Sequence, residues 1–490
     1  MPSDHPDPAG GGTIAVLRTK FLDPDEEELI HEQTLTSLAD IGVMILSPSV
    51  LAMLKDAGAE VDPTRNVAHI PEGLVREALQ KAPKRIRYCA REPRHEFEIP
   101  APSHPYTATN GLAVHIPDLE TGEDHSSTRT DLASFTRLAD ALDPVDYLWT
   151  SLTTTEVPEV SHGLHELWIT MQNTSKHVES ITVVSAEDAR MQIALASLVA
   201  GGADALRKRP IISVVACPVA PLSFSRGPVQ AQVEFARAGV PVLSMSMCLG
   251  GTTSPVTLAG TLATINAENL ASLVIDQVAA PGSPHIYTSD STPVDVRTGY
   301  IDYAAVETPL ISAGAAQMAK RYGLPCMTAG WGSCIGTELG LPAFSELSSI
   351  LLSVMPGTDL SAGMGGMDHA KGCSYEQLIL DARLWEHLRA TMRAFTISEE
   401  TIALDVMRDV GHGNTFLRHP HTVRNFRTEL FFRDPKKLAW EATLSDRMLP
   451  EAREVARKLL KEHEVLPLDR DVVREGDALI REYEKGLRTE

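Results

Sequence analysis

The stretch IISVVACPVAPLSFSRGPVQAQVEFARAGVPVLSMSMCL, residues 211–249, decides the fold class. It opens with a short apolar run rich in β-branched residues and continues with apolar residues at helical spacing up to Gly239. A second apolar run closes it at residues 242–249. Two short apolar runs joined by an amphipathic helix are typical of a strand–helix–strand unit, in which the two strands lie parallel in one sheet.

The same alternation recurs along residues 107–395. Candidate strands begin near residues 107, 147, 177, 211, 242, 284, 325 and 358, and a helical pattern follows each. Eight such units in about 280 residues predict an α/β fold of the (β/α)8 TIM-barrel class. A doubly wound sheet is the alternative, but G-x-G-x-x-G would normally follow its first strand, and ATNGLAV at residues 108–114 lacks that pattern. Residues 112–128 also fit a hairpin that turns at Thr121-Gly122.

The segments outside the barrel differ from it in composition. Residues 1–20 predict a disordered tail, residues 21–106 a helical N-terminal extension, and residues 396–490 a charged helical C-terminal extension that covers the barrel. Within the N-terminal extension we expect three helices, near 24–41, 48–57 and 71–82. Asp23 is placed to cap the first of them.

Composition excludes several classes of protein. The 490 residues are 43% hydrophobic and 22% charged, which is ordinary for a globular enzyme. A formal net charge of -21 argues against nucleic acid and anionic membrane as partners, since both need clustered Lys and Arg. We find no apolar run near 18 residues, and the polar N-terminus lacks a secretory pattern. The six cysteines are scattered, which favours a reduced, cytoplasmic protein.

Candidate site residues follow from the rule that barrel enzymes place chemistry at the carboxyl ends of their strands. The first strand offers Asn110, or His115 if the hairpin interpretation is wrong. The later strand ends and their loops add the following residues: Thr154, Thr155, Glu156, Glu179, Cys217, Met247, Cys248, Ser289, Asp290, Asp295, Arg297, Tyr300 and His369. Glu156 and Asp290 could converge as carboxylates, although each also fits a helix cap or an internal ion pair.

Two neighbouring strand ends are rich in glycine. Trp331 stands between Gly330 and Gly332, and the eighth strand end carries Gly363, Gly365 and Gly366. These glycines have three interpretations: tight packing of the backbone, a phosphate-binding site, or an open barrel mouth that admits a large group. The ring of Trp331 is either ordinary core packing or the wall of a pocket for a cation.

Metal motifs are weak. His162 and His165 share a helix face, but no second cluster has diagnostic spacing, and we expect no metal held by this chain. Neither a P-loop nor a G-x-S-x-G nucleophile motif is present.

Long stretches resemble one family. These are HEQTLTSLADIGVMILSPSVLAMLKDAGAEVD (31–62), SPVTLAGTLATINAENLASLVIDQVAAPGSPHIY (254–287), ETPLISAGAAQMAKRYGLPC (307–326), SYEQLILDARLWEHLRATMRAF (374–395) and ISEETIALDVMRDVGHGNTFLRHPHTVRNFRTELFF (397–432). Over roughly residues 20–485 the chain is similar to the trimethylamine methyltransferase family. That resemblance implies a (β/α)8 barrel that passes a methyl group from an amine to a corrinoid (cobalamin) carried by a partner protein.

One departure narrows the substrate that the resemblance implies. The trimethylamine branch of the family carries pyrrolysine in the loop after strand seven, whereas this loop reads WGSCIGTELGLPAF (331–344). The resemblance to members without pyrrolysine implies a quaternary amine such as glycine betaine. Its nitrogen is already charged, so no catalytic acid or base is required, and we expect Asn110, Glu156 and Asp290 to position the substrate.

Roles can be assigned to the remaining candidates. We expect Trp331 and Tyr300 to face the ammonium group and Arg297 to hold the substrate carboxylate, with His369 and Asn110 next in order. The glycines at 330, 332, 363, 365 and 366 would let the corrinoid approach. A barrel enzyme for a phosphorylated small molecule, with Lys371 as the nearest cation, and a non-catalytic betaine-binding protein are the alternatives. We also expect a homo-oligomer.

Overall fold

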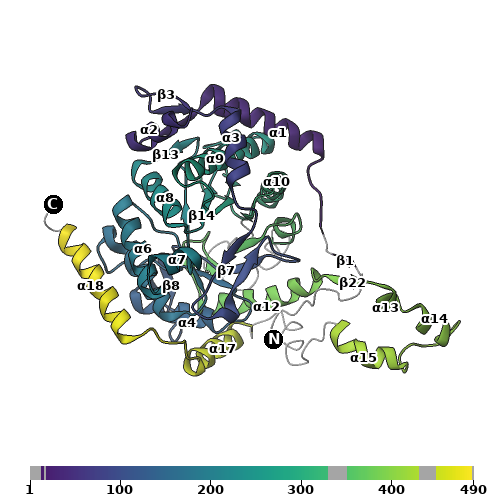
Figure 1. Ribbon diagram of the computed structural model, residues 1–490. Helices are drawn as coiled ribbons and strands as arrows, with labels where there is room; N and C mark the ends of the chain where they lie inside the picture. The colour runs from purple at the N-terminus through teal and green to yellow at the C-terminus, as the bar shows by residue number, and fades with distance from the viewer. Residues whose placement is uncertain (1–12, 16–17, 329–330, 332–349, 430–447, 488–490) are drawn as a thin grey trace.

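Eight parallel strands close into a barrel in the computed structural model, which describes residues 13–15, 18–328, 331, 350–429 and 448–487 (Figure 1). The strands are β7 (Tyr106–Thr109), β10 (Tyr147–Trp149), β11 (His177–Ser180), β12 (Ile212–Ala216), β14 (Val242–Ser246), β16 (His285–Ser289), β18 (Cys326–Thr328) and β19 (Leu360–Met364). β7 pairs with both β19 and β10, which closes the ring. Each predicted strand segment contains one barrel strand, so the (β/α)8 prediction is confirmed.

Helices surround this barrel. They are α4 (Arg129–Asp140), α5 (His162–Asn173), α6 (Ala186–Ala200), α7 (Ala203–Lys208), α8 (Arg226–Ala238), α9 (Leu258–Ala279), α10 (Thr308–Arg321) and α12 (Tyr375–Thr391). Local sequence fixes their ends. Thr128 and Asp131 form a reciprocal capping box at the start of α4, and Gly239 ends α8 at φ +77°, a conformation that glycine adopts without strain.

Side chains along the strands alternate between the barrel interior and the surrounding helices. Tyr147 belongs to the interior cluster, whereas Leu148 belongs to an outer cluster beneath the helices. A hairpin of β5 (Ile86–Tyr88) and β6 (Phe97–Ile99) adds its side chains to the same interior. Tyr88 packs against Tyr147 and His177, the first residues of β10 and β11. The hairpin therefore closes the amino ends of the strands and leaves the mouth at their carboxyl ends.

The N-terminal extension combines helices with a small sheet. Its helices α1 (Pro24–Thr36), α2 (Pro48–Asp56) and α3 (Glu72–Lys81) agree with the prediction, and Asp23 caps α1 in a capping box with Glu26. The sheet was not predicted. It contains β2 (Val43–Ile45), β3 (Glu60–Asp62), β4 (Val67–His69) and β13 (Ser223–Phe224).

Helix α9 is long and apolar enough, by length and composition alone, to cross a membrane. In the structure it lies between the N-terminal extension and the barrel, and most of its residues are buried in the largest hydrophobic cluster. Its position as the core helix of a folded domain accounts for that composition.

Two parts of the C-terminal extension behave differently. Helices α13 (Glu399–Ile402), α14 (Leu404–Val410) and α15 (Pro420–Glu429) form an arm that projects from the barrel (Figure 1), rather than covering it as predicted. At its base β22 (Phe395–Ile397) pairs with β1 (Thr13–Ala15), so the predicted disordered tail contains a strand. Helices α17 (Met448–Glu462) and α18 (Arg470–Leu487) do pack on the barrel helices.

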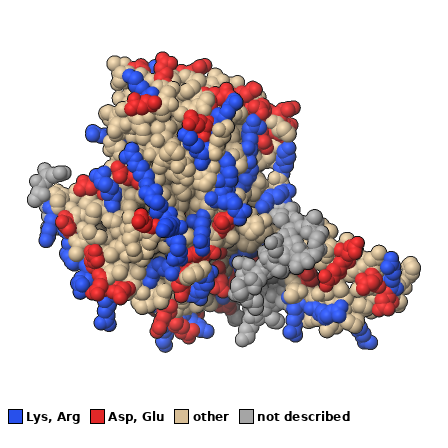
Figure 2. Space-filling view, viewed as in Figure 1, with Lys and Arg blue, Asp and Glu red and all other residues tan. Residues whose placement is uncertain are grey.

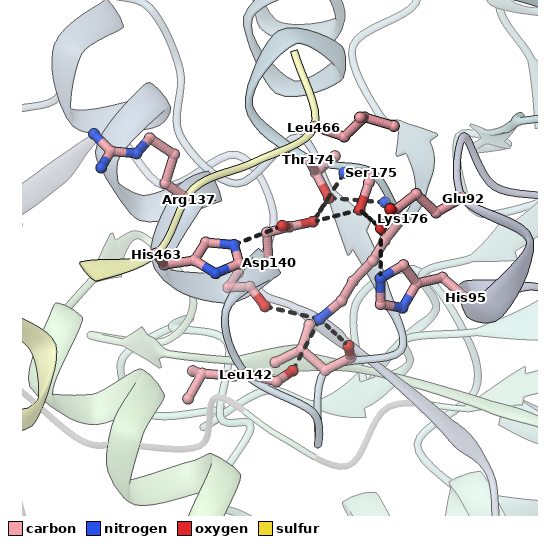
Figure 3. Close-up of polar contacts among 12 residues, drawn as sticks. Glu92, His95, Arg137, Asp140, Leu142, Thr174, Ser175, Lys176, His463 and Leu466 are labelled. Carbon is pink, nitrogen blue, oxygen red and sulfur yellow. Dashed lines mark hydrogen bonds and ion pairs between the residues drawn. The ribbon is translucent and has the colours of Figure 1, made fainter. Parts of the chain in front are cut away.

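A buried polar cluster joins α17 to the barrel (Figure 3). Asp140 accepts hydrogen bonds from the Thr174 hydroxyl (2.6 Å) and lies 2.7 Å from Nε2 of His463, which follows α17. Lys176 donates to three backbone carbonyls at the end of α4. Burial lowers the pKa of Lys176 to about 8, against the raising effect of Asp140.

On the face seen in Figure 2, basic and acidic side chains are interspersed over barrel and arm.

Candidate functional site

Five residues lie at or just after the carboxyl ends of five consecutive barrel strands. Trp149, Ile181 and Met247 are partly buried and pack on top of the interior cluster. Cys217 and Asp290 follow β12 and β16, and Asp290 acts on the Cys217 thiol electrostatically. We call these five residues the mouth.

Asp290 is the carboxylate of the mouth. It accepts a hydrogen bond from the Tyr303 hydroxyl at 3.0 Å. Burial raises the pKa of Asp290 to about 6, and the Tyr303 hydrogen bond opposes that rise. Among the described residues no Lys, Arg or His lies within ion-pair distance of it. An ionised carboxylate without a counter-cation in a largely apolar site favours a positively charged ligand.

Cys217 lies beside Asp290. More than a third of its surface is exposed, yet burial among protein atoms raises the pKa of its thiol to about 12, and the carboxylates of Asp290 and Glu268 add to the rise. The Cys217 side chain thus contacts solvent and is also densely surrounded by protein atoms, which is typical of a side chain that lines a recess. A thiol with this pKa stays protonated at neutral pH and is a poor nucleophile.

Glu179 lies at the level of the mouth residue Trp149, its register partner, and is fully buried within the barrel. Its Oε2 atom is 2.7 Å from the Ser213 hydroxyl and 3.3 Å from the Tyr88 hydroxyl, while Oε1 has no hydrogen-bond partner among the described residues. Burial raises the pKa of Glu179 to about 7, although its hydrogen bonds lower it.

The Trp149 ring stands directly beside Glu179. The two residues are register partners on β10 and β11, and the indole lies over Gly111, where an added Cβ would come within 2.5 Å of its Cε3 atom. Nε1 of Trp149 has no hydrogen-bond partner among the described residues. The indole N–H is nevertheless near enough to Glu179 to lower the pKa of its carboxyl group. Sequence reasoning selected Glu179, Cys217 and Met247 by position and missed Trp149, although the inward alternation Tyr147, Trp149 could have indicated it.

A four-stranded sheet contains His369 in one of its turns and is contacted by Asn110. Its strands are β8 (His115–Pro117), β9 (Asp124–Ser126), β20 (Gly366–Met367) and β21 (Gly372–Cys373). The hairpin of β8 and β9 confirms the alternative interpretation of residues 112–128. Asn110 donates from Nδ2 to the Ala370 carbonyl at 3.2 Å and so anchors the turn between β20 and β21.

His369 lies in that turn. Asp368, His369 and Ala370 have φ values of 49°, 53° and 66°, a run of left-handed residues that costs free energy for non-glycine side chains. The Nδ1 atom of His369 is buried without a partner among the described residues. Strain and an unsatisfied nitrogen are consistent with a ligand contact, and the role of His369 remains a prediction.

Three of the predicted site residues lie away from the barrel interior. Glu156 accepts a hydrogen bond from the Arg129 backbone at 2.7 Å and caps the start of α4, which is the structural role weighed against a catalytic one. Arg297 pairs with Asp295 at 2.9 Å, and its side chain is 85% exposed. Tyr300, on the same loop, is 72% exposed. Glu156 therefore has the structural role of a helix cap, and its convergence with Asp290 stays a prediction.

Trp331 lies in the outer cluster, not in the barrel interior. It is only 7% exposed and packs edge-on against Trp385 of α12, with ring centroids 5.9 Å apart. This is the packing interpretation of Trp331, and it places the ring away from the mouth residues described above. Residues 332–344, the rest of the loop, lie outside the described residues.

The glycines of the eighth strand end are explained by close packing. An added Cβ would come within 2.7 Å of Trp331 Cβ at Gly363, within 2.8 Å of Phe135 at Gly365, and within 3.0 Å of Asn110 at Gly366. Gly363 and Gly365 also have positive φ. Gly330 and Gly332 lie outside the described residues. A corrinoid contact at these glycines remains a prediction, and the structure supplies a sufficient reason for three of them without it.

The candidate metal-binding histidines have other partners. His162 contacts the Val157 carbonyl at 2.9 Å, and His165 contacts Glu484 of α18 at 2.9 Å. Within the described parts of the chain, no group of three or more His, Cys, Asp or Glu is arranged to hold a metal ion.

The fold and the mouth define a (β/α)8-barrel protein whose polar groups converge at the carboxyl ends of the strands. Residues 12–486 match the trimethylamine methyltransferase (MTTB) family, and the chain belongs to it. It is 30% identical to trimethylamine methyltransferase MttB of Methanosarcina barkeri over 98% of both chains, and 27% identical to glycine betaine methyltransferase of Desulfitobacterium hafniense over 87% of both. The crystal structure of Methanosarcina barkeri monomethylamine methyltransferase matches 91% of this chain and 88% of its own, with a TM-score of 0.55 and 12% identity, which shows the shared fold.

Proposed function

We propose that this protein transfers a methyl group from a quaternary amine, glycine betaine or a close relative, to the Co(I) corrinoid of a partner protein. Membership of the family supports methyl transfer from an amine. Similarity to a glycine betaine methyltransferase supports the quaternary class. The corrinoid protein is the methyl acceptor in this proposal, and its Co(I) supplies the nucleophile.

One observation carries the substrate class. The Glu179 carboxyl group lies beside the Trp149 ring, and the Asp290 carboxylate lies at another strand end of the same mouth, with no cationic side chain in ion-pair contact with either acid among the described residues. A cation over an indole face gains about 0.5–2 kcal/mol, and the gain is larger where water is excluded. A protonated amine with fewer methyl groups would also be attracted to this site, but it can donate hydrogen bonds as well. A quaternary cation has no N–H group, so its binding depends most on an aromatic face and a nearby negative charge.

The chemistry requires little from the protein besides binding and alignment. When a methyl carbon leaves a quaternary nitrogen, both electrons of the broken C–N bond stay on nitrogen, and a neutral tertiary amine results. No proton has to be supplied at that step, so Asp290, Trp149 and Glu179 need only bind the cation, orient one C–N bond toward the mouth and exclude water.

The loop after β18 supports the same substrate class. Its sequence, WGSCIGTELGLPAF at 331–344, contains no lysine and consists of standard residues throughout. We therefore propose that trimethylamine is a poor substrate. A phosphorylated substrate is disfavoured because the described mouth presents carboxyl groups where a phosphate would require cations.

Cysteine chemistry supports a cytoplasmic location in this proposal. The five described cysteines are all free thiols, and four of them are buried. Reduced thiols are typical of reducing compartments. We also propose that the protein works as a homo-oligomer, as expected from its sequence.

A methyl-transfer assay tests the proposal directly. The protein is mixed with a Co(I) corrinoid protein, or with free Co(I) cobalamin, and with glycine betaine, choline, carnitine or trimethylamine in turn, and the corrinoid spectrum is followed. We expect methylation of the corrinoid with one or more quaternary amines and much slower methylation with trimethylamine. Trimethylamine turnover as fast as betaine turnover would contradict the proposed substrate class. Betaine binding without any methylation would identify a binding protein instead.

A further inference from the structure

A chain of three hydrogen bonds ends at Glu179, but a neutral His177 and the Ser213 hydroxyl together supply only two protons for it. Three contacts run in line: His177 Nδ1 to the Cys89 carbonyl (2.8 Å), His177 Nε2 to the Ser213 hydroxyl (2.9 Å), and the Ser213 hydroxyl to Glu179 Oε2 (2.7 Å). All three distances are ordinary hydrogen-bond distances, and each contact needs one proton.

A proton count shows what is missing. The Cys89 carbonyl can only accept, so Nδ1 of His177 must carry a proton and donate it. With a neutral imidazole, Nε2 then accepts, and Ser213 donates its single proton to it. The remaining contact, between Ser213 and Glu179, can be filled only by a proton from Glu179 itself.

The alternative location of the extra proton is His177. A doubly protonated imidazole would donate to Ser213, which would then donate to an ionised Glu179. Burial lowers the pKa of His177 to about 3, although the Cys89 and Pro210 carbonyls oppose that shift, and burial raises the pKa of Glu179 to about 7. The two shifts agree that the proton resides on Glu179, because the low-polarity interior disfavours a pair of separated charges.

The other titratable groups around Glu179 are two tyrosines. Tyr88 comes from β5 and Tyr147 from β10, and burial raises the pKa of both phenols well above the usual range. They stay neutral at physiological pH. Among the described residues packed against Glu179, only Glu179 itself therefore titrates near neutrality, since His177 stays a neutral imidazole.

One oxygen of the Glu179 carboxyl group lacks a partner among the described residues, and Glu179 neighbours the ring proposed to hold the ligand. Oε1 is buried without a partner among the described residues, and Trp149, the register neighbour of Glu179, is partly exposed at the mouth. Neighbouring strands lie about 4.8 Å apart, so a cation on the Trp149 ring would be close to the Glu179 carboxyl group. A nearby positive charge favours the ionised form of a carboxyl group.

We propose that Glu179 is a neutral acid in the resting protein, held in that state through Ser213 and His177, and that it releases its proton to solvent when an organic cation binds at Trp149. This inference rests on the proposed function for the class of ligand. The balance is simple: one O–H bond of Glu179 breaks on binding, and the proton goes to water. Once the methyl group has left and the amine is neutral, Glu179 regains one proton from solvent.

Infrared spectroscopy of the ligand-free protein tests the resting state. The difference spectrum of wild type minus Glu179→Gln at pH 6 should contain the carbonyl stretch of a protonated carboxyl group, and this band should fade by pH 8.5. Glu166→Gln is the matched control, because Glu166 is a buried glutamate on α5 with a pKa raised to about 6 that lies outside the barrel interior. In the spectrum of wild type minus Glu166→Gln the Glu179 band should cancel, because both proteins retain Glu179. Absence of the Glu179 band at pH 6 would overturn the proposal.

Titration calorimetry with glycine betaine tests the linkage. Binding heats are measured at pH 7 in two buffers of different ionisation enthalpy, for wild type and for both variants. At that pH Glu179 carries about half a proton and Asp290 about a tenth, so wild type and Glu166→Gln should release about 0.6 proton per betaine and Glu179→Gln about 0.1.

The outcomes separate the two proposals. One outcome is that wild type binds betaine but releases no more protons than Glu179→Gln does. That result would overturn the proposed link between cation binding and proton release from Glu179, and it would leave the proposed function standing. No betaine binding by wild type would overturn the proposed substrate and the linkage together, and the infrared result would then decide the resting state of Glu179 alone.

Discussion

Trp149 and Glu179 are register partners on β10 and β11, and both side chains point into the barrel. This register puts an indole beside a buried carboxyl group, and an exposed thiol and a second carboxylate lie at the ends of two further strands. A pocket for an organic cation needs an aromatic face and negative charge in a dry place, and this register supplies them from two adjacent strands.

The first prediction separates two tryptophans. Trp149→Ala should weaken glycine betaine binding by about 1–2 kcal/mol, or roughly 5–30-fold, because one desolvated cation–aromatic contact is lost. Trp149→Phe should retain part of the affinity, since the smaller ring has a weaker quadrupole. Calorimetry on the three proteins measures the change.

Trp331→Ala is the matched comparison for this prediction. Trp331 is buried against Trp385 in the outer cluster, so truncation should cost about 3–5 kcal/mol of stability and leave the affinity of the folded protein nearly unchanged. Thermal unfolding and betaine affinity measured on both alanine variants distinguish the roles. A large loss of affinity in Trp331→Ala with an unchanged melting temperature would return Trp331 to the site and contradict the assignment to Trp149.

The second prediction concerns the pH dependence of cation binding at Asp290. Burial raises the pKa of Asp290 to about 6, and the Tyr303 hydroxyl stabilises the ionised form. Affinity for betaine should therefore fall as the pH drops through 6, because the carboxylate becomes neutral. Tyr303→Phe should move this midpoint upward by about one pH unit, since a hydrogen bond to a charged group is worth about 1.5–3 kcal/mol and part of it is replaced by solvent.

Asp290→Asn provides the control for that midpoint. It keeps the shape of the side chain and the contact with Tyr303 but carries no charge at any pH. The variant should bind betaine more weakly at pH 8 and lose the part of the decline that has its midpoint near pH 6, while the decline linked to Glu179 near pH 7 remains. A decline of the same size and midpoint in Asp290→Asn would assign the titration to another group.

The fold was predictable because its signals are local and repeated. Each barrel strand is a short apolar run followed by a helix with its own caps, as at Thr128 and Gly239, so the eight-fold alternation is visible in the sequence. The sheet of β2, β3, β4 and β13 was missed because its strands are two or three residues long and one of them comes from a distant part of the chain. Such strands leave no periodicity to read.

The site was harder to predict because strand-end position does not tell which way a side chain points. Asp290 was selected correctly as a residue at a strand end, and the structure places it in the mouth. Trp331 was favoured because it stands between two glycines in the sequence, but its side chain packs in the outer cluster, against Gly363 of β19. Trp149 was missed because strand length and register, which set the inward face, depend on pairing with neighbours that the sequence alone does not specify.

The third prediction concerns how the last helix is attached. At Gly476 of α18 an added Cβ would come within 2.3 Å of the Trp168 ring on α5, and Trp168 also donates to Asp477 at 2.8 Å. Gly476→Ala should therefore displace α18 and increase its susceptibility to limited proteolysis. Gly486→Ala on the same helix is the control, because an added Cβ there meets nothing within 4 Å. It should be neutral or stabilising by up to about 1 kcal/mol, as expected for replacing glycine in a helix. Equal proteolysis of the two variants would contradict this account of the docking.

The last prediction links Glu179 to stability. Burial raises its pKa from 4.5 to about 7 on folding, so the folded state binds this proton more tightly than the unfolded state does. The stability that the neutral acid contributes is complete below pH 4.5 and is lost as the pH rises to about 7. A shift of that size corresponds to about 3 kcal/mol, at 1.36 kcal/mol per pKa unit.

Glu179→Gln removes this titration while keeping a neutral side chain of the same shape. The free energy of unfolding of wild type relative to Glu179→Gln should therefore decrease between pH 5 and pH 8, by an amount on the order of 3 kcal/mol, and then level off. Urea denaturation across this range measures the difference, and Glu166→Gln run in parallel reports a second buried glutamate whose pKa is raised to about 6, so its decrease should be complete at lower pH. A constant difference between wild type and Glu179→Gln would mean that Glu179 is already ionised in the folded protein at pH 5, and the proton count through Ser213 and His177 would then have to be filled by an imidazolium.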